Sequence, residues 1–355
     1  MSRNKRVVSL KGKLLGGNNP ILIQTMANLK TSRVEDILRM DEDLTHLGND
    51  LLRLSVLDEK DAEAFKILSS KTSTPLIADI HFNYLFALKA IANGAAAIRI
   101  NPGNIGSEDK LIKVISAAKE KGLPIRIGVN SGSLPLKYVS AKEEANAYVS
   151  ALKEVIKVME DHDFYDLVLS LKSSDPEVTY QAYKKADELF NYPLHIGVTE
   201  AGEGYVGALR SSVALVPLLK EGIGDTIRIS LTDPPRDEVL AARALLKALG
   251  LIQDVPVLVS CPTCGRTQVD LLKVSKIVSK HLEGLNVNLK VAVMGCPVNG
   301  PGEAKDADLG LAGGVDSFLV FEHGKPLKSL PEEEAIRFLL SEIDRLANLK
   351  KQQKN

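Results

Sequence analysis

ILIQTM (21–26) is a short aliphatic run. A helical pattern, RVEDILRMDEDLTHLG (33–48), follows it, and a second aliphatic run, LLRLSV (51–56), comes next; this repeating unit decides the fold. The same order repeats along residues 20–250. The further runs are PLIADI (75–80), AAIRI (96–100), PIRIGVN (124–130), DLVLSLK (166–172), LHIGVTE (194–200) and DTIRISL (225–231). Strands that alternate with helices predict βα units and a parallel sheet. Eight units within about 230 residues predict a closed (β/α)8 barrel of the TIM type, as a domain spanning residues 1–250.

An open, doubly wound sheet is the alternative arrangement of repeated βα units. Two features favour the barrel. Eight is the number of units in a TIM-type barrel, and no glycine-rich dinucleotide turn follows the first run. The pattern Gly202-x-Gly204-x-x-Gly207 occurs much later in the chain. Alone it is a weak motif, and we interpret it as a flexible or anion-binding loop.

Residues 251–355 follow a different pattern. VPVLVS (255–260) and LKVAVMG (289–295) predict strands, and TQVDLLKVSKIVSKHLEGL (267–285) predicts an amphipathic helix between them. DLGLAGG (308–314) and SFLVFEHGKP (317–326) predict a hairpin, and a terminal helix follows. This part is therefore predicted to be a small C-terminal α/β domain.

The composition excludes several classes of protein. Lysine and arginine together number 45, as do aspartate and glutamate, so the formal net charge is zero, which argues against a nucleic-acid or anionic-membrane surface protein. The N-terminal residues lack the apolar core of a signal peptide, and no run approaches the roughly 18 apolar residues of a membrane span. An odd, clustered set of cysteines without a secretion signal predicts a reduced, cytoplasmic, metal-binding protein.

The three cysteines all lie in the C-terminal part, as Cys261-Pro-Thr-Cys264 and as Cys296-Pro-Val-Asn-Gly-Pro-Gly-Glu303. Three thiolates are one ligand short of a four-coordinate metal or cluster site, and Glu303 is the strongest candidate for the fourth. Structural zinc is the alternative, because C-x2-C pairs are common in zinc ribbons. No second such pair or nearby histidine pair is present, and Cys-Pro dipeptides are frequent in iron–sulfur proteins. These features favour an iron–sulfur site, with an iron that a substrate could take over from the weak oxygen ligand.

Polar side chains occur at the ends of most predicted barrel strands, where barrel active sites are built. Five of them are cations, which together indicate a multiply charged anion, most plausibly phosphate or diphosphate. The alternative is a salt-bridged layer inside the barrel. The cations are Arg53, Arg99, Arg126, Lys172 and Arg228.

Two acidic residues and one histidine are further candidates. Asp79 and His81 share one face of their strand, so Asp79 could orient His81; a structural histidine is the alternative. Glu200 ends the seventh predicted strand beside a glycine-rich loop, where it could donate a proton or pair with an arginine.

CPTCGRTQVDL (261–271), followed by MGCPVNGPGEAKDADLG (294–310), closely resembles the signature of the 4-hydroxy-3-methylbut-2-en-1-yl diphosphate synthase family. The barrel segments also resemble the family, so that the similarity covers residues 5–330. It implies the compact bacterial form with two domains, a barrel and a cluster domain over 251–355. It also implies a [4Fe–4S] cluster held by Cys261, Cys264, Cys296 and Glu303.

The resemblance further implies a substrate site in the barrel mouth. The cyclic diphosphate would bind there, with Glu200 delivering a proton and Glu303 and His81 also taking part in catalysis. The residues implied in binding are Arg53, Asp79, Arg99, Arg126, Asn130, Lys172, Arg228 and Ser230.

The implied reaction is the reductive ring opening and dehydration of 2-C-methyl-D-erythritol 2,4-cyclodiphosphate to 4-hydroxy-3-methylbut-2-enyl diphosphate, in the methylerythritol phosphate route to isoprenoids. It consumes two electrons and two protons and releases water. The implied partners are reduced flavodoxin or ferredoxin and a second copy of the chain, as a homodimer in which the cluster domain of one subunit acts on the barrel of the other. The alternative function is a redox-neutral barrel transferase or lyase for a phosphorylated ligand, with a structural zinc site.

Overall fold

A computed structural model of the protein describes residues 5–101, 104–130, 144–297 and 304–353. The chain divides into two compact units, Met1–Leu249 and Gly250–Asn355. Among the described residues, no helix combines the length and the apolar character needed to cross a lipid bilayer.

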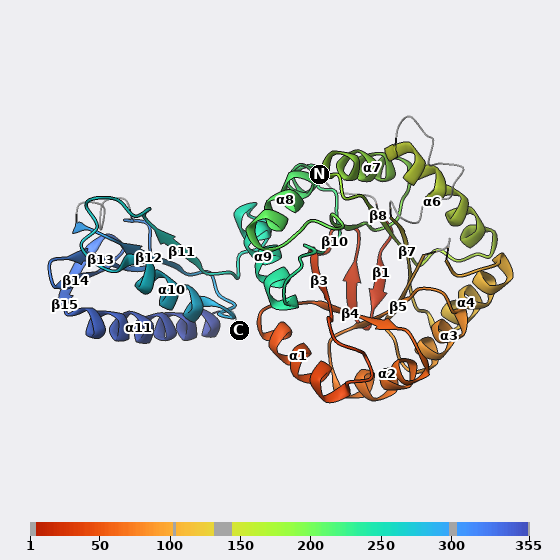
Figure 1. Ribbon diagram of the computed structural model, residues 1–355, viewed down its shortest axis with the longest axis horizontal. Helices are drawn as coiled ribbons and strands as arrows, with labels where there is room; N and C mark the ends of the chain where they lie inside the picture. The colour runs from red at the N-terminus through yellow and green to blue at the C-terminus, as the bar shows by residue number, and fades with distance from the viewer. Residues whose placement is uncertain (1–4, 102–103, 131–143, 298–303, 354–355) are drawn as a thin grey trace. The chain divides into compact units, whose positions relative to one another are not determined.

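The first unit is a closed barrel of eight parallel strands, as the sequence predicts (Figure 1). The strands pair in the order β8-β7-β6-β5-β4-β3-β10-β9, and a parallel bridge between Leu169 and Leu194 closes the ring. Strands such as β5 and β8 are buried on both faces, which explains their continuous aliphatic runs. The strands are β3 (Leu22–Met26), β4 (Leu51–Val56), β5 (Leu76–Ile80), β6 (Ala97–Ile100), β7 (Ile125–Asn130), β8 (Leu167–Lys172), β9 (His195–Ile196) and β10 (Thr226–Ile227).

Helices surround the strands as an outer ring (Figure 1). Several begin at a side chain that accepts a hydrogen bond from a backbone N–H of the first turn, as Asp58, Asn83 and Asp175 do. The described barrel helices are α1 (Val34–His46), α2 (Glu59–Lys71), α3 (Tyr84–Ala92), α4 (Glu108–Lys121), α6 (Glu144–Asp161), α7 (Pro176–Leu189), α8 (Gly204–Lys220) and α9 (Pro235–Ala248).

The last two barrel strands are shorter than the sequence predicts. The runs 194–200 and 225–231 suggest long strands, but β9 ends at Ile196 and β10 ends at Ile227. Glu200 has a φ of 53°, in the left-handed region, and an extended strand cannot continue through that conformation. The polar ends of both runs, residues 197–200 and 228–231, are loops at the barrel mouth, and the Glu200 conformation accounts for the end of the first run only.

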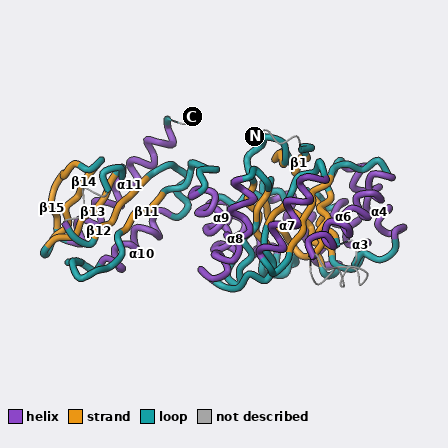
Figure 2. Tube along the Cα trace, turned by 90° about the horizontal axis from the view of Figure 1, so that it is seen from above, coloured by secondary structure: helices purple, strands orange, loops and turns teal. Residues whose placement is uncertain are grey.

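A hairpin before the first barrel strand closes one end of the barrel, and the sequence pattern did not reveal it. Strands β1 (Val8–Leu10) and β2 (Lys13–Leu15) pair antiparallel, and β1 lies at one end of the barrel (Figure 2). Side chains of the hairpin share one buried cluster with residues at the beginnings of five barrel strands. The hairpin therefore covers the end opposite the mouth. The cluster consists of Val8, Leu10, Leu15, Leu22, Leu51, Ile77, Ala97 and Val168.

The second unit is a small α/β domain with one five-stranded sheet. Three parallel strands, β11 (Val257–Ser260), β12 (Lys290–Met294) and β13 (Leu309–Gly314), continue into two antiparallel strands. The predicted hairpin is confirmed as the β13–β14 pair, and β15 extends it. Helices α10 and α11 share one buried core with the sheet. The remaining elements are α10 (Leu271–Leu282), β14 (Ser317–Glu322), β15 (Lys325–Leu330) and α11 (Glu332–Gln352).

We predict that replacing Leu10 by alanine lowers the free energy of unfolding by about 2–5 kcal/mol, because the side chain is buried in the hairpin cluster and leaves a cavity. Leu14→Ala is the matched control, since Leu14 lies in the same hairpin and is 48% exposed. All eight tyrosines lie within residues 1–249 and the chain has no tryptophan, so tyrosine fluorescence in urea follows the barrel alone. Equal destabilisation by the two variants would contradict the role of the hairpin as a packed closure.

Candidate active site

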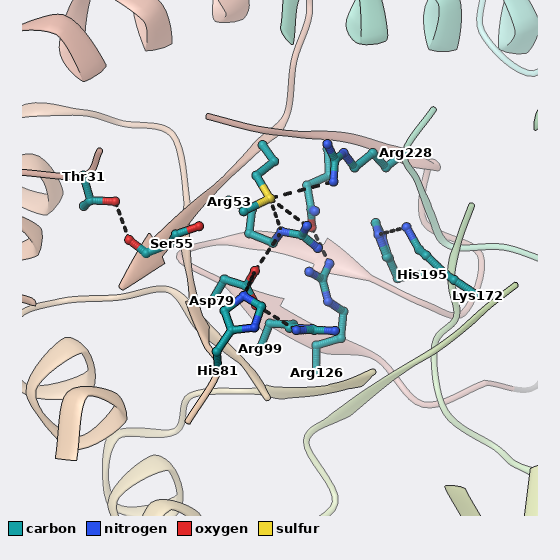
Figure 3. A network of polar contacts seen from close by, with 12 residues as sticks. Thr31, Arg53, Ser55, Asp79, His81, Arg99, Arg126, Lys172, His195 and Arg228 are labelled. Atoms are coloured by element: carbon teal, nitrogen blue, oxygen red, sulfur yellow. Dashed lines mark hydrogen bonds and ion pairs between the residues drawn. The ribbon is translucent and has the colours of Figure 1, made fainter. Parts of the chain in front are cut away.

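The predicted cations meet at the carboxyl ends of the barrel strands, around one small cavity (Figure 3). The cavity has a volume of about 180 Å³. All five cationic side chains line it, together with four polar residues of the predicted set or its strand ends. The lining residues are Met26, Arg53, Asp79, His81, Arg99, Arg126, Ser170, Lys172, Thr199, Arg228 and Ser230.

Asp79 is the centre of the first group of contacts. Arg99 Nη1 donates a hydrogen bond to Asp79 Oδ1 at 3.1 Å, and Arg53 Nε lies 3.6 Å from Oδ2. His81 Nε2 lies 3.4 Å from the same Oδ2. Burial pushes the pKa of Asp79 upward, but the charge of Arg53, the contact with His81 and the charge of Arg99 outweigh it, so that its pKa is well below the ordinary value. Asp79 is thus an ionised carboxylate that holds two arginines and one histidine at the mouth.

Arg228 is held by a different carboxylate, which belongs to helix α9. Its Nε and Nη2 donate to the two oxygens of Glu238 at 2.9 and 2.8 Å, a bidentate arrangement. Glu238 also accepts hydrogen bonds from Thr25 Oγ1 and from the backbone N–H of Leu231. A buried carboxylate with all these donors fixes the orientation of Arg228.

Arg126 and Lys172 have neutral partners instead. Arg126 Nη1 donates to Gln24 Oε1 at 2.5 Å, and Lys172 Nζ lies 3.3 Å from His195 Nε2. Among the residues that the structure describes, no carboxylate oxygen lies within 4.0 Å of either cation. These two cations therefore differ from the other three.

Burial and mutual repulsion lower the pKa of three of the five cations. Burial lowers the pKa of Arg53 to about 10, although Asp79 partly offsets this effect. The pKa of Lys172 is well below its usual range because the side chain is buried and because Arg228 and Arg53 are close. The pKa of Arg126 is lowered for the same reasons, by burial and then by Arg53 and Arg99. A bound anion would reverse these shifts, so the cavity is suited to a multiply charged anion.

Two glycines make space for the cations. A Cβ on Gly197 would lie 2.8 Å from Lys172 Nζ and 2.6 Å from the carbonyl oxygen of Arg228. A Cβ on Gly128 would lie 3.0 Å from the Arg99 guanidinium. A side chain at Gly197 would collide with a backbone atom that has no freedom to move away.

The other predicted site residues are distributed unevenly. Ser230 lines the cavity. Asn130 is the last residue of β7 and pairs in register with Lys172 of β8. Glu200 is exposed and is not among the described residues that line the cavity.

Sequence reasoning missed five residues of this site. Gln24 and Met26 alternate along ILIQTM, and that polar break in a strand run was an available signal. Met26 Sδ accepts contacts from Arg53 at 3.1 and 2.7 Å. His195, at the start of a short strand, gave only the weak signal of a polar residue in an aliphatic run. Thr199 and Glu238 gave none, because both take part through tertiary contacts.

The cysteine loops lie at one edge of the second sheet. Cys261 directly follows β11 and Cys296 follows β12 by two residues, and these two strands are parallel neighbours. The Gly295 backbone N–H donates to Cys261 Sγ at 3.3 Å, and the Gln268 N–H donates to the Gly295 carbonyl at 2.9 Å. Parallel strands end at the same edge, so the two cysteine loops are neighbours.

The thiol of Cys264 is in an environment that favours thiolate. Hydrogen bonds from the backbone and then the side chain of Arg266 lower its pKa. Thiolates on adjacent loops, with a backbone N–H directed at one sulfur, suit an iron–sulfur cluster. Over the described ranges, no group of three or more His, Cys, Asp or Glu side chains lies close enough to hold a single metal ion. Glu303 lies outside the described residues.

Comparisons with known proteins identify the family and the fold. The family described as GcpE TIM-barrel domain matches residues 5–243, and the GcpE protein C-terminal domain matches residues 257–345. Two solved barrels are similar in fold only. Dihydropteroate synthase from Stenotrophomonas maltophilia has a TM-score of 0.52 at 15% identity, covering 71% of this chain and 99% of that one. Type I 3-dehydroquinate dehydratase from Clostridium difficile has a TM-score of 0.51 at 14% identity, covering 69% and 98%.

Curated relatives are similar over nearly the whole chain. The 4-hydroxy-3-methylbut-2-en-1-yl diphosphate synthase (flavodoxin) of Caldanaerobacter subterraneus is 47% identical over 98% of this chain and 98% of its own length. The protein of the same name from Clostridium perfringens is 45% identical over 96% of this chain and 99% of its own length. The chain therefore belongs to the GcpE family of 4-hydroxy-3-methylbut-2-en-1-yl diphosphate synthases.

Proposed function

We propose that this protein is an oxidoreductase that converts 2-C-methyl-D-erythritol 2,4-cyclodiphosphate into 4-hydroxy-3-methylbut-2-enyl diphosphate in isoprenoid biosynthesis. Family membership supports the activity, and the relatives' names indicate flavodoxin as the electron donor. One structural observation carries the proposal: five buried or half-buried cations converge on a single cavity at the barrel mouth. The redox-neutral alternative with structural zinc loses its support, because the relatives are named as flavodoxin-dependent synthases.

The barrel's part in this reaction is to bind and orient the diphosphate. Charge-assisted hydrogen bonds from arginine and lysine are the strongest contacts available to phosphate oxygens. Asp79 and Glu238 keep three of the cations in place before the ligand arrives, which reduces the cost of ordering them. The proposed binding residues are Arg53, Asp79, Arg99, Arg126, Asn130, Lys172, Arg228 and Ser230.

Two residues, His81 and Glu200, are proposed to deliver protons. His81 lines the cavity, its side chain is 36% exposed and its Nε2 contacts Asp79, so Asp79 can orient the imidazole for proton transfer at the other ring nitrogen. Glu200 is a proposed proton donor on family grounds, and its exposed position requires its side chain to turn toward the ligand.

Cys261, Cys264, Cys296 and Glu303 are proposed to hold a [4Fe–4S] cluster. When bound, the cluster supplies low-potential electrons and an iron that accepts an oxygen ligand. The chain's own contribution is the set of thiolates and the N–H of Gly295 directed at Cys261. A homodimer and a cytoplasmic location remain predictions from the family resemblance and the clustered cysteines.

We predict that Lys172→Ala weakens substrate binding by about 1.5–3 kcal/mol because it removes a charged hydrogen bond, and that it destabilises the protein less than Arg228→Ala does, because it leaves no described carboxylate unpaired. Arg228→Ala should weaken binding and also destabilise the protein by about 3–5 kcal/mol, because Glu238 loses its buried partner. Calorimetry with the cyclic diphosphate and urea unfolding measure the two effects.

Lys185→Ala provides the control for this pair, since its ammonium contacts Asn146 on the outside of the barrel. It should bind substrate as the wild type does. Unchanged affinity of Lys172→Ala, with a normal cluster content, would make Lys172 a structural residue and contradict its proposed role.

We predict that Glu303→Ala loses cluster stability and turnover together, because one iron then lacks a protein ligand. Glu303→Cys should keep the cluster and lose turnover, because thiolate is not displaced by a substrate oxygen as carboxylate is. Mössbauer spectra of anaerobically reconstituted protein follow the unique iron. A wild-type spectrum and normal turnover in Glu303→Ala would show that the assignment is wrong.

We predict that mixing Cys264→Ser subunits with Lys172→Ala subunits restores part of the activity at a substrate concentration too low for Lys172→Ala to bind, because a mixed dimer contains one intact barrel and one intact cysteine set. Assays of purified, doubly tagged heterodimers measure this complementation, and each homodimer is its own control. Verified heterodimers without activity would contradict cooperation between subunits.

A further inference from the structure

We propose that Gln24 and His195 are positioning residues that keep the anion site positively charged. Gln24 holds Arg126 and His195 holds Lys172, each through a neutral hydrogen-bond acceptor. The positive charge of these two cations is therefore not neutralised by the protein and is available to the ligand. This inference rests on the proposed diphosphate-binding function. It adds a specific role for two residues that do not themselves line the cavity.

The contact between Gln24 and Arg126 is the first basis. Gln24 is 1% exposed and lies on β3, across the barrel interior from Arg126 on β7. Because arginine only donates, the short contact fixes the amide with its oxygen toward Arg126. The Gln24 Nε2 and Arg126 Nη2 atoms are both buried and have no partner among the described residues. Arg126 therefore keeps an unused donor, which is costly until a ligand or water occupies it.

The contact between His195 and Lys172 is the second basis. His195 is fully buried on β9, and its Nε2 faces Lys172 Nζ (Figure 3). A lysine ammonium only donates, so a charged Lys172 assigns Nε2 as the acceptor and makes the imidazole neutral, with its proton on Nδ1. Nδ1 is buried and has no partner among the described residues, a cost that the structure accepts. Burial and then the charges of Arg126 and Lys172 lower the pKa of His195 well below its usual range, in agreement with this assignment. His195 thus orients Lys172 without neutralising it.

The other three cations of the cavity are held by carboxylates, which is the alternative to neutral acceptors. Arg53 and Arg99 share the Asp79 carboxylate, and Arg228 forms an ion pair with Glu238. Carboxylates would also fit the positions of Gln24 and His195 as hydrogen-bond acceptors, and they would stabilise the empty protein. They would also cancel the positive charge that a diphosphate needs. Neutral acceptors hold Arg126 and Lys172 in the same positions and leave their positive charges uncompensated. This arrangement favours ligand affinity at the expense of the stability of the empty protein.

Gln24→Glu tests this directly, because it preserves size and the acceptor facing Arg126, adds a negative charge and removes only an Nε2 donor that has no partner among the described residues. We expect the affinity of the full-length protein for inorganic pyrophosphate, measured by calorimetry without divalent cations, to fall about tenfold or more. We expect Tm without ligand to rise by about 2 °C or more, because Arg126 gains an ion pair. The matched control is Asn146→Asp, which places the same new charge opposite Lys185 on the barrel exterior.

The His195 position gives an independent test. His195→Gln retains a neutral acceptor and should keep most of the pyrophosphate affinity, whereas His195→Glu should lose it. Wild-type affinity in Gln24→Glu, or a Gln24→Glu protein that is less stable than wild type or fails to fold, would overturn the proposal. If the wild type itself does not bind pyrophosphate, the diphosphate site and this inference fall together. If it binds and the charge variants bind equally well, only the inference is wrong.

Discussion

Electrostatic repulsion among five cations in one small cavity is the constraint on which the barrel mouth depends. In the described part of the chain, only Asp79 and Glu238 contact these cations with a carboxylate. The remaining repulsion between the cations must be offset by the stability of the barrel itself, which comes from its buried strands and its closed ring of parallel strand pairs. A site of this kind is destabilising when empty and stabilised by an anion, which is the thermodynamic signature expected of a diphosphate site.

The closed end of the barrel makes this arrangement possible. The N-terminal hairpin and the first residues of five strands form an apolar cluster below the charged layer. This cluster includes residues of β4, β6 and β8, the strands that carry Arg53, Arg99 and Lys172, and so anchors them at their opposite ends. The small domain has the complementary design: its helices pack on the sheet, while its cysteines occupy loops at the strand ends. In both units, an apolar core supports candidate functional side chains at the carboxyl ends of parallel strands.

The division of work between the two units matches the chemistry of the family. In the proposed function, the barrel would provide cations and hydrogen bonds for an anionic ligand, and the small domain would provide soft sulfur ligands. Neither set of side chains could do the task of the other, because thiolates repel phosphate and buried arginines do not bind iron.

The amino-acid sequence by itself determined the eight βα units, the small C-terminal domain and the five strand-end cations, because strand and helix periodicities are local and the polar positions follow from them. It also revealed the family through the cysteine segments. The tertiary structure alone decided which cation meets which partner. Gln24, His195 and Glu238 reach the site from strands or a helix distant in sequence, and no local pattern encodes such contacts. The short β9 and β10 and the hairpin closure were likewise decided by backbone conformation and long-range packing.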